Sequence, residues 1–226
     1  MTTDSQEPAG QQPASTYPAR VTIDYVDDNR NRLTVFFRIL LVIPIAIVVG
    51  GIAGDYWGWG YEGSQDNNWN TQVGFTLGGI SLLFWPVLLM ILFRQKYPRW
   101  WFEFNLQLVR FSTRIGAYVG LLTDEYPSTD EEQGVHLEID YPDASQLNRW
   151  LPLIKWFLAI PHYIVLILLF LAAIVIVVVG WFIILFTGKF PRGFHDFLVG
   201  VTRWALRVEV YVLLLTTDEY PPFSLD

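Results

Sequence analysis

Three long apolar segments, separated by shorter polar and charged segments, give the chain its main pattern. Residues 33–52 and 75–93 are almost wholly apolar, and residues 151–187 contain only Lys155 and His162 as ionisable groups. A transmembrane helix needs about 20 apolar residues, so the first two segments predict one span each and the third predicts two. We therefore expect four transmembrane helices, over residues 33–52, 75–93, 150–169 and 170–187.

Alternating apolar and polar residues predict a short strand at the start of each half of the chain. In residues 135–141 the apolar positions alternate with His136, Glu138 and Asp140, which is typical of a half-buried strand. Residues 21–25 follow the same pattern over fewer positions. Two further short strands are expected over residues 117–122 and 210–215, where they could pair with the leading strands, each ended by a proline.

Polar residues at helical spacing predict two amphipathic helices, over residues 99–116 and 192–207. Each carries one polar stripe on an otherwise apolar cylinder, formed by Glu103, Gln107, Arg110 and Arg114 in the first and by Asp196, Gly200, Arg203 and Arg207 in the second. These helices could cross the membrane, but three charges on one stripe favour a position in the membrane interface.

The second half of the chain repeats the first. Residues 21–44 resemble residues 135–161, and residues 96–127 resemble residues 189–221. The phrase LLTDEYP in the first half returns as LLTTDEYP in the second. Residues 54–74, rich in Gly, Asn and Trp, have no counterpart and are an insertion in the first half. A self-similar chain of this kind is built from two copies of one structural unit.

These patterns predict a mainly α membrane protein of two tandem repeats. Each repeat is expected to contain a strand, a transmembrane helical hairpin, an interfacial amphipathic helix and a short strand. The expected segments are a disordered polar tail (1–19), repeat 1 (20–127), a linker (128–134) and repeat 2 (135–226). The hairpin of repeat 1 contains the long loop 54–74, whereas that of repeat 2 requires a tight turn near Leu169.

The distribution of Lys and Arg predicts the orientation of the spans. The fifteen basic residues lie before the first span, between the second and third spans, or after the fourth, apart from Arg38 and Lys155, which lie inside spans near their basic ends. The positive-inside rule then places both termini and the central segment in the cytoplasm and the loop 54–74 outside.

Composition agrees with a membrane protein and excludes several classes of chemistry. The chain is 52% hydrophobic and only 16% charged, against about 25% charged residues in a typical soluble domain. It contains no cysteine, which excludes disulfides, thiolate catalysis and cysteine-ligated metals. Its net charge of −7 argues against a nucleic-acid partner. The polar first nineteen residues lack the basic and apolar regions of a signal peptide.

The repeated charges form the strongest candidate constellation. Like charges four residues apart on a helix repel one another, so the arginine pairs of the two amphipathic helices need anionic partners. We expect either internal carboxylates or phospholipid headgroups, since guanidinium groups suit phosphate. The members of this charge network are Arg110, Arg114, Arg203, Arg207, Glu103, Asp196, Asp124, Glu125, Asp218 and Glu219.

His162 is a second, isolated candidate. Ionisable residues inside a span are functional candidates by default, and a neutral imidazole could bind a haem or a chlorin. However, the first half has Ile45 at the equivalent position, so no symmetric pair of ligands exists. A structural hydrogen bond is the favoured role, and no cofactor or metal is expected.

Two segments carry a resemblance to a known family. The sequence IPHYIVL and the long sequence from ILFTGKF to PPFSL, together with their first-half counterparts, resemble the bacterial membrane proteins grouped as domain of unknown function 4389. The resemblance covers nearly all of residues 17–226 as two tandem copies, and implies a multi-pass protein of the bacterial cytoplasmic membrane. It implies no catalytic residue.

By elimination, the sequence favours a non-catalytic accessory or assembly subunit beside a larger membrane complex. The apolar spans need lipid or protein neighbours, and Phe84, Trp85 and Trp181 are candidate partner-facing residues. A lipid-binding protein, a small-solute transporter and a self-associating membrane protein are the alternatives. An enzyme is not expected, because no catalytic triad, phosphate-binding loop or acidic dyad is evident.

Overall fold

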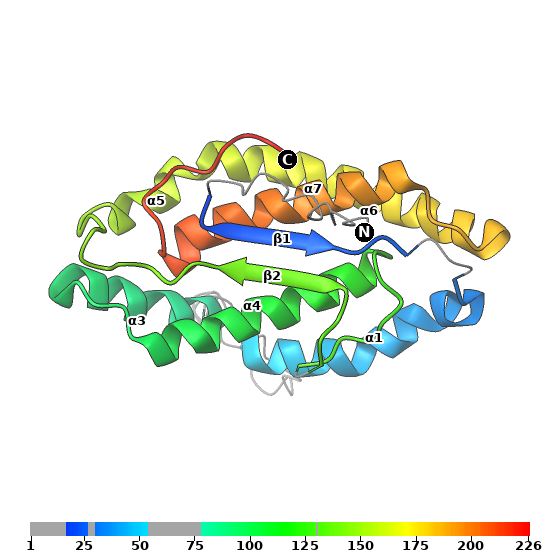
Figure 1. The fold of residues 1–226 in the computed structure, drawn as a ribbon, viewed down its shortest axis with the longest axis horizontal. Coiled ribbons are helices and arrows are strands. Elements are labelled where there is room, and N and C mark those ends of the chain that lie inside the picture. Colours follow the sequence, from blue (N-terminus) through cyan, green and yellow to red (C-terminus); the bar gives the residue numbers. More distant parts are fainter. Residues whose placement is uncertain (1–16, 27–29, 54–77, 130) are drawn as a thin grey trace, which may run out of the picture.

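A computed structural model describes residues 17–26, 30–53, 78–129 and 131–226 (Figure 1). This part of the chain is mainly helical with a small two-stranded sheet. Its elements are β1 (Ala19–Ile23), α1 (Arg32–Ala53), α3 (Gly78–Arg94), α4 (Arg99–Val119), β2 (Val135–Ile139), α5 (Pro152–Leu158), α6 (Ile160–Thr187), α7 (Arg192–Glu209) and the π-helical turn η1 (Val210–Leu214).

The two strands come from different halves of the chain and pair with each other. β1 and β2 are antiparallel, with Val21 opposite Leu137. Both strands lead into the sequence Ile-Asp-Tyr, and aligning the halves on it makes Val21 equivalent to Leu137. Two equivalent residues that face each other across an antiparallel pair lie on a local two-fold axis. The halves therefore meet about an axis through the centre of the sheet.

One face of the sheet is polar and the other is buried. The outer face carries exposed polar residues, and Arg20 pairs there with Glu138 at 3.7 Å and with Asp140 at 3.0 Å. The inner face packs on two helices, β1 on α7 and β2 on α4. In Figure 1, α7 runs beside β1 and α4 beside β2, with α6 beyond α7 and with α1 and α3 on the α4 side. The alternation found in the sequence thus predicted both strands.

The two amphipathic helices are confirmed as helices, but the short strands expected after them are wrong. α4 continues to Val119, and α7 is followed by the π-helical turn η1. Because β1 and β2 already pair with each other, the sheet needs no strand from these segments. Both segments end instead at a buried leucine in the left-handed conformation, Leu121 (φ 62°) and Leu215 (φ 55°).

The turn η1 explains how the halves keep the same geometry despite a difference in length. The second half has one more residue between Tyr211 and Leu215 than the first has between Tyr118 and Leu121. A π-helical turn accommodates one extra residue within a helix. The extra residue therefore leaves the tyrosine and the left-handed leucine of both halves buried.

The helical hairpin expected over residues 150–187 is also wrong. Residues 160–187 form one continuous helix, α6, and the expected turn near Leu169 is absent. The preceding residues form the short helix α5, and the break between them lies at Ala159, two residues before Pro161. Pro161 thus occupies the first turn of α6, where a proline costs least, whereas the Leu, Ile and Ala residues around Leu169 favour helix continuation.

The first two apolar segments form helices at the expected places, α1 and α3. Residues 75–77 of the expected second span and the loop 54–74 lie outside the described residues. The polar tail ends earlier than expected, because Tyr17 is buried and its hydroxyl donates to the backbone oxygen of Arg207. Ala19 is already part of β1.

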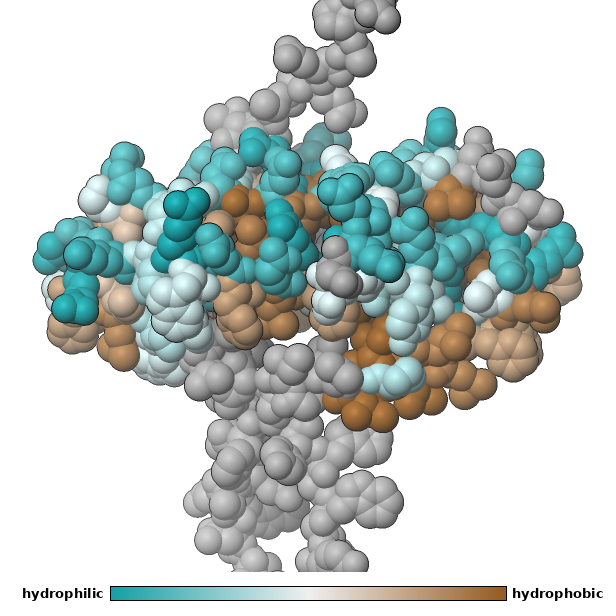
Figure 2. Space-filling model, turned by 60° about the horizontal axis from the view of Figure 1, so that its bottom comes forward, coloured by the Kyte–Doolittle hydropathy of each residue, from teal (hydrophilic) through white to brown (hydrophobic). Residues whose placement is uncertain are grey.

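Polar and apolar side chains separate to opposite sides of the molecule. In Figure 2 hydrophilic residues gather along the upper side and hydrophobic residues along the lower side. Helices α1, α3, α5 and α6 supply most of the large exposed apolar side chains. On α6, residues such as Leu168 (63% exposed) and Phe186 (79% exposed) present most of their surface outward.

Candidate functional site

Each half contains a buried cation that forms an ion pair with the aspartate of its Thr-Asp-Glu-Tyr-Pro sequence. Arg38 of α1 is 3% exposed and its Nη2 lies 2.6 Å from Asp124 Oδ1. Lys155 of α5 is 1% exposed and its Nζ lies 2.8 Å from Asp218 Oδ1. A buried charge is tolerated when it is paired and hydrogen-bonded. The repeated phrase therefore supplies the counterion of a buried cation.

Each cation also meets a backbone oxygen and a buried tyrosine ring. Arg38 donates to the backbone oxygen of Tyr118 at 2.7 Å, and its guanidinium lies 4.4 Å from the centre of that ring. Lys155 donates to the backbone oxygen of Thr217 at 2.6 Å and lies 4.9 Å from the centre of the Tyr211 ring. The face of an aromatic ring attracts a cation, so both tyrosines add to the local stabilisation.

The first half holds a second buried cation that the sequence analysis missed. Arg30 donates to the backbone oxygens of Leu121 at 2.5 Å and Leu122 at 3.3 Å, and lies 3.7 Å from Asp124. Burial lowers the pKa of Arg30; Asp124 opposes this shift and Arg38 adds to it. The equivalent position in the second half is Leu147, so a search for duplicated charges could not find Arg30.

The four arginines of the amphipathic helices bind backbone oxygens rather than the expected carboxylates. Arg110 Nε donates to Leu137 of β2 at 3.0 Å, and Arg203 Nη1 donates to Leu225 at 3.1 Å. Arg114 donates to Ser128 at 2.7 Å, and Arg207 donates to Ser224 and Asp226. Among the described residues none of them forms an ion pair with Asp124, Glu125, Asp218 or Glu219. These arginines thus bind β2 to α4, and they bind the segments that follow the two Thr-Asp-Glu-Tyr-Pro sequences to α4 and α7.

The remaining acidic candidates lie apart from these arginines. Glu103 pairs with Arg99 on the exposed face of α4, and Asp196 contacts His195 at 3.3 Å. The carboxylate of Glu125 accepts a hydrogen bond from the backbone of Gly134. Glu219 accepts one from Tyr17 through its backbone oxygen at 3.4 Å. The structure thus brings Asp124 and Asp218 to the buried cations and leaves the other four acidic candidates elsewhere.

Matched contacts also cross between the halves. The Tyr25 hydroxyl donates to the backbone oxygen of Phe190, and the Tyr141 hydroxyl donates to that of Tyr97, both at 2.5 Å. Tyr97 and Phe190 are equivalent residues, each directly before the proline that precedes α4 or α7. Each half is therefore fastened to the start of the other half's amphipathic helix.

His162 lies in a closed aromatic cluster. It is fully buried, its Nδ1 accepts a hydrogen bond from Trp204 Nε1 at 3.1 Å, and its ring stacks on Phe223 at 4.0 Å between ring centres. The Nε2 atom is buried without a hydrogen-bond partner among the described residues. These contacts show that His162 packs α6 against α7 and the final segment.

The three aromatic residues expected to face a partner differ in their surroundings. Trp85 is 54% exposed on α3. Phe84, by contrast, packs against the core, and Trp181 stacks near Phe36 and donates to the backbone oxygen of Val35 at 3.1 Å. Only Trp85 of the three presents most of its surface outward.

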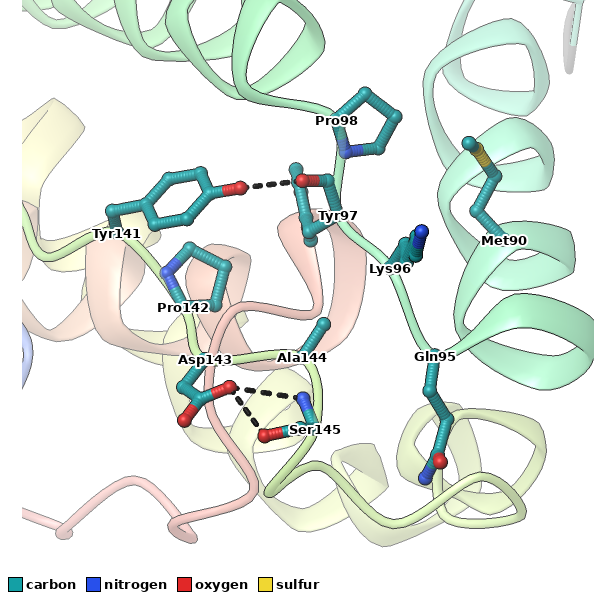
Figure 3. A pocket seen from close by; sticks show the side chains of 10 residues that line it. All are labelled: Met90, Gln95, Lys96, Tyr97, Pro98, Tyr141, Pro142, Asp143, Ala144 and Ser145. Atoms are coloured by element: carbon teal, nitrogen blue, oxygen red, sulfur yellow. Dashed lines mark hydrogen bonds between the residues drawn. The ribbon is translucent and has the colours of Figure 1, made fainter.

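An open cavity lies between residues 95–98 and 141–145, next to Met90 of α3 (Figure 3). Its volume is about 700 Å³. Three of its polar side chains are hydrogen-bonded: Tyr141 donates to Tyr97, Asp143 accepts from Ser145, and Gln95 accepts from Arg149. The side chain of Lys96 also lines the cavity. No group of three or more His, Cys, Asp or Glu residues that could hold a metal occurs in the described ranges.

A second cavity is an apolar groove near the end of α6. Its volume is about 450 Å³. It is lined by residues of three helices: Arg38 and Val42 of α1, Val119 and Leu121 at the end of α4, and Val177, Val178, Trp181 and Phe182 of α6. One of the two buried cation clusters therefore borders this groove.

Among the residues that the structure describes, one helix, α6, is long and apolar enough to cross a membrane. Only 11% of its most apolar stretch is buried against the rest of the chain. The described residues thus support one candidate membrane helix by length and composition, in place of the four expected.

A comparison with known protein families supports the resemblance to domain of unknown function 4389, but for one copy of the domain instead of two. Residues 150–224 match the family model described as "Domain of unknown function (DUF4389)". The match falls in the second half, and the first half is not matched as a second copy. No curated protein and no solved structure matches the chain. The segment from α5 to the final Ser-Leu is thus similar to a family without an assigned activity.

Proposed function

We propose that the protein is a non-catalytic integral membrane protein that packs as an accessory or assembly subunit beside a larger membrane complex. The observation that carries this proposal is the exposure of α6. Only four of its 28 residues are buried, namely His162, Leu166, Gly180 and Ile184. Most of the others are partly or fully exposed, and they are predominantly apolar.

Such a helix requires apolar surroundings on most of its circumference. At about 25 cal/mol per Å² of apolar surface, exposing these side chains to water would cost more than the stability of an ordinary domain. Lipid or protein neighbours remove this cost. The separation of polar and apolar side chains in Figure 2 supports the same placement, with the apolar side embedded and the sheet in the aqueous phase.

The buried charges support a structural role rather than catalysis. Arg30, Arg38 and Lys155 hold the segments that follow α4 and η1, and Arg110, Arg114, Arg203 and Arg207 hold β2 and the two chain segments beyond. Their hydrogen bonds close each half of the molecule. We infer further that the halves are two copies of one DUF4389-like unit in the bacterial cytoplasmic membrane, with the basic side in the cytoplasm.

The experiment is site-specific photo-crosslinking in native membranes. A photoreactive amino acid at Trp85 or Leu168 is expected to capture a second membrane protein, whereas the same group at Glu138 on the polar face is not. Capture of this chain alone would favour self-association. Labelling by lipid alone at both apolar positions would contradict the accessory-subunit proposal.

A further inference from the structure

The groove between α1, the end of α4 and α6 combines apolar walls with a buried cation. A volume of about 450 Å³ lies within the roughly 300–1,000 Å³ of small-molecule sites. All the lining residues except Arg38 are apolar. The groove therefore suits an aliphatic chain that carries a charged or polar group at one end.

The charge beside the groove is not balanced within the described residues. Arg30 and Arg38 share one carboxylate, Asp124, at 3.7 Å and 2.6 Å. In the second half, a single cation, Lys155, has one carboxylate, Asp218. The first cluster thus has one more positive charge than the second. The Nε atoms of both Arg30 and Arg38 are also buried without a hydrogen-bond partner in the part of the chain that is described.

A buried, uncompensated charge is costly, and an anion beside it lowers that cost. Guanidinium groups bind phosphate through short, charge-assisted hydrogen bonds. The excess positive charge therefore indicates an anionic group, and the apolar walls indicate an acyl chain attached to it. Both features occur together in one class of membrane molecule.

We propose that this groove binds an anionic phospholipid, with an acyl chain along Val42, Val178 and Phe182 and its phosphate beside Arg38. The proposal concerns the isolated chain in lipid, and it stands whether or not a partner subunit is recovered. The lipid would connect α1 to α6 where their own side chains leave the groove open.

Native mass spectrometry of the delipidated full-length protein in detergent tests this site. Phosphatidylglycerol should bind at least tenfold more tightly than phosphatidylcholine with the same chains. Val178→Trp, which fills the groove without touching the arginines, should weaken phosphatidylglycerol binding at least tenfold. Leu168→Trp adds the same bulk to α6 at an exposed position outside the groove, and should leave binding unchanged.

Two further ligands and one charge variant show whether the groove recognises the phosphate, the acyl chain or both. Glycerol 3-phosphate, which has no acyl chain, should not compete, whereas palmitate tests whether a carboxylate on a chain can replace the phosphate. Arg30→Gln should reduce the preference for phosphatidylglycerol over phosphatidylcholine. Equal binding of the two phospholipids, unchanged binding by Val178→Trp, or effective competition by glycerol 3-phosphate would overturn the proposal.

Discussion

The ammonium group of Lys155 meets a carboxylate at 2.8 Å, a backbone oxygen at 2.6 Å and a tyrosine ring at 4.9 Å while the residue is 1% exposed. Arg38 has the same three kinds of neighbour in the other half. Removing the carboxylate leaves a buried cation unpaired, which is the costly case for an ion pair, and removing the cation leaves a carboxylate that is only 25% exposed without its counterion. At the scale of the residue, these two cations are the positions most sensitive to substitution.

Lys155→Met should lower the free energy of unfolding by about 3 kcal/mol, because Asp218 keeps its charge without its cation. The double variant Lys155→Met, Asp218→Asn should recover part of this loss. Arg20→Met breaks only exposed ion pairs on the sheet and should cost under about 1 kcal/mol. Denaturant unfolding of the purified variants measures all three. Equal effects at Lys155 and Arg20 would contradict the role given to the buried pair.

Glu209 at the end of α7 should make stability depend on pH. Burial raises the pKa of its carboxyl from 4.5 to about 7, so the folded state binds a proton more tightly than the unfolded state. Stability should therefore fall as pH rises from about 4.5 to about 7, by about 1–3 kcal/mol. Glu209→Gln should remove this dependence. Melting temperatures of both proteins across that pH range provide the measurement, and parallel curves would disprove the assignment.

At the scale of the element, the residues at the two ends of α6 set its length. Pro161 fits the first turn of α6, and Gly188 ends the helix in the left-handed conformation (φ 74°). Between them four residues of the helix are buried against its neighbours. One of these, Gly180, allows the ring of Phe190 to approach the helix backbone, where a Cβ atom would collide with the ring.

Gly180→Ala should destabilise the protein by about 1–3 kcal/mol, because the added methyl group overpacks the contact with Phe190. Adding Phe190→Leu should restore part of the loss by making room for the methyl group. Gly193→Ala in α7 is the matched control, since its Cβ would meet nothing within 4 Å, and it should be neutral or slightly stabilising. Thermal unfolding distinguishes these outcomes; a neutral Gly180→Ala would show that the contact with Phe190 is not tight.

At the scale of the whole molecule, a polar sheet lies across the centre and apolar helices extend along it (Figures 1 and 2). The contacts of Tyr25 with Phe190 and of Tyr141 with Tyr97 tie the halves together. Neither half is therefore expected to fold fully without the other. The placement of this molecule in a membrane can be tested directly, because the sequence contains no cysteine.

Single cysteines at Ser64 and Thr129 should report opposite sides of the membrane. A membrane-impermeant thiol reagent should label Ser64→Cys in intact cells, because the positive-inside rule predicts that the segment 54–74 is outside. Thr129→Cys should be labelled only after the membrane is permeabilised. Protection of both positions in intact cells would contradict the crossing and favour a protein embedded from the cytoplasmic side alone.

The sequence by itself determined the two amphipathic helices, the two leading strands and which charges recur. Local spacing is sufficient for this, because α4, α7, β1 and β2 carry complete periods of three to four or of two residues. Duplication also pointed to Asp124 and Asp218, which both lie in the buried clusters, but the predicted charge network did not include their cations, Arg38 and Lys155.

Only the tertiary structure decided which of these groups meet. The sequence predicted carboxylates or lipid headgroups as partners of the arginines on α4 and α7, but those arginines donate to backbone oxygens. The carboxylates go to the more deeply buried cations, where an unpaired charge costs most. Likewise, β1 and β2 pair with each other across the two-fold axis. Residues 117–122 and 210–215 therefore do not join the sheet and form helical or turn structure instead. Contacts between distant segments depend on relative placement, which residue spacing along one segment does not contain.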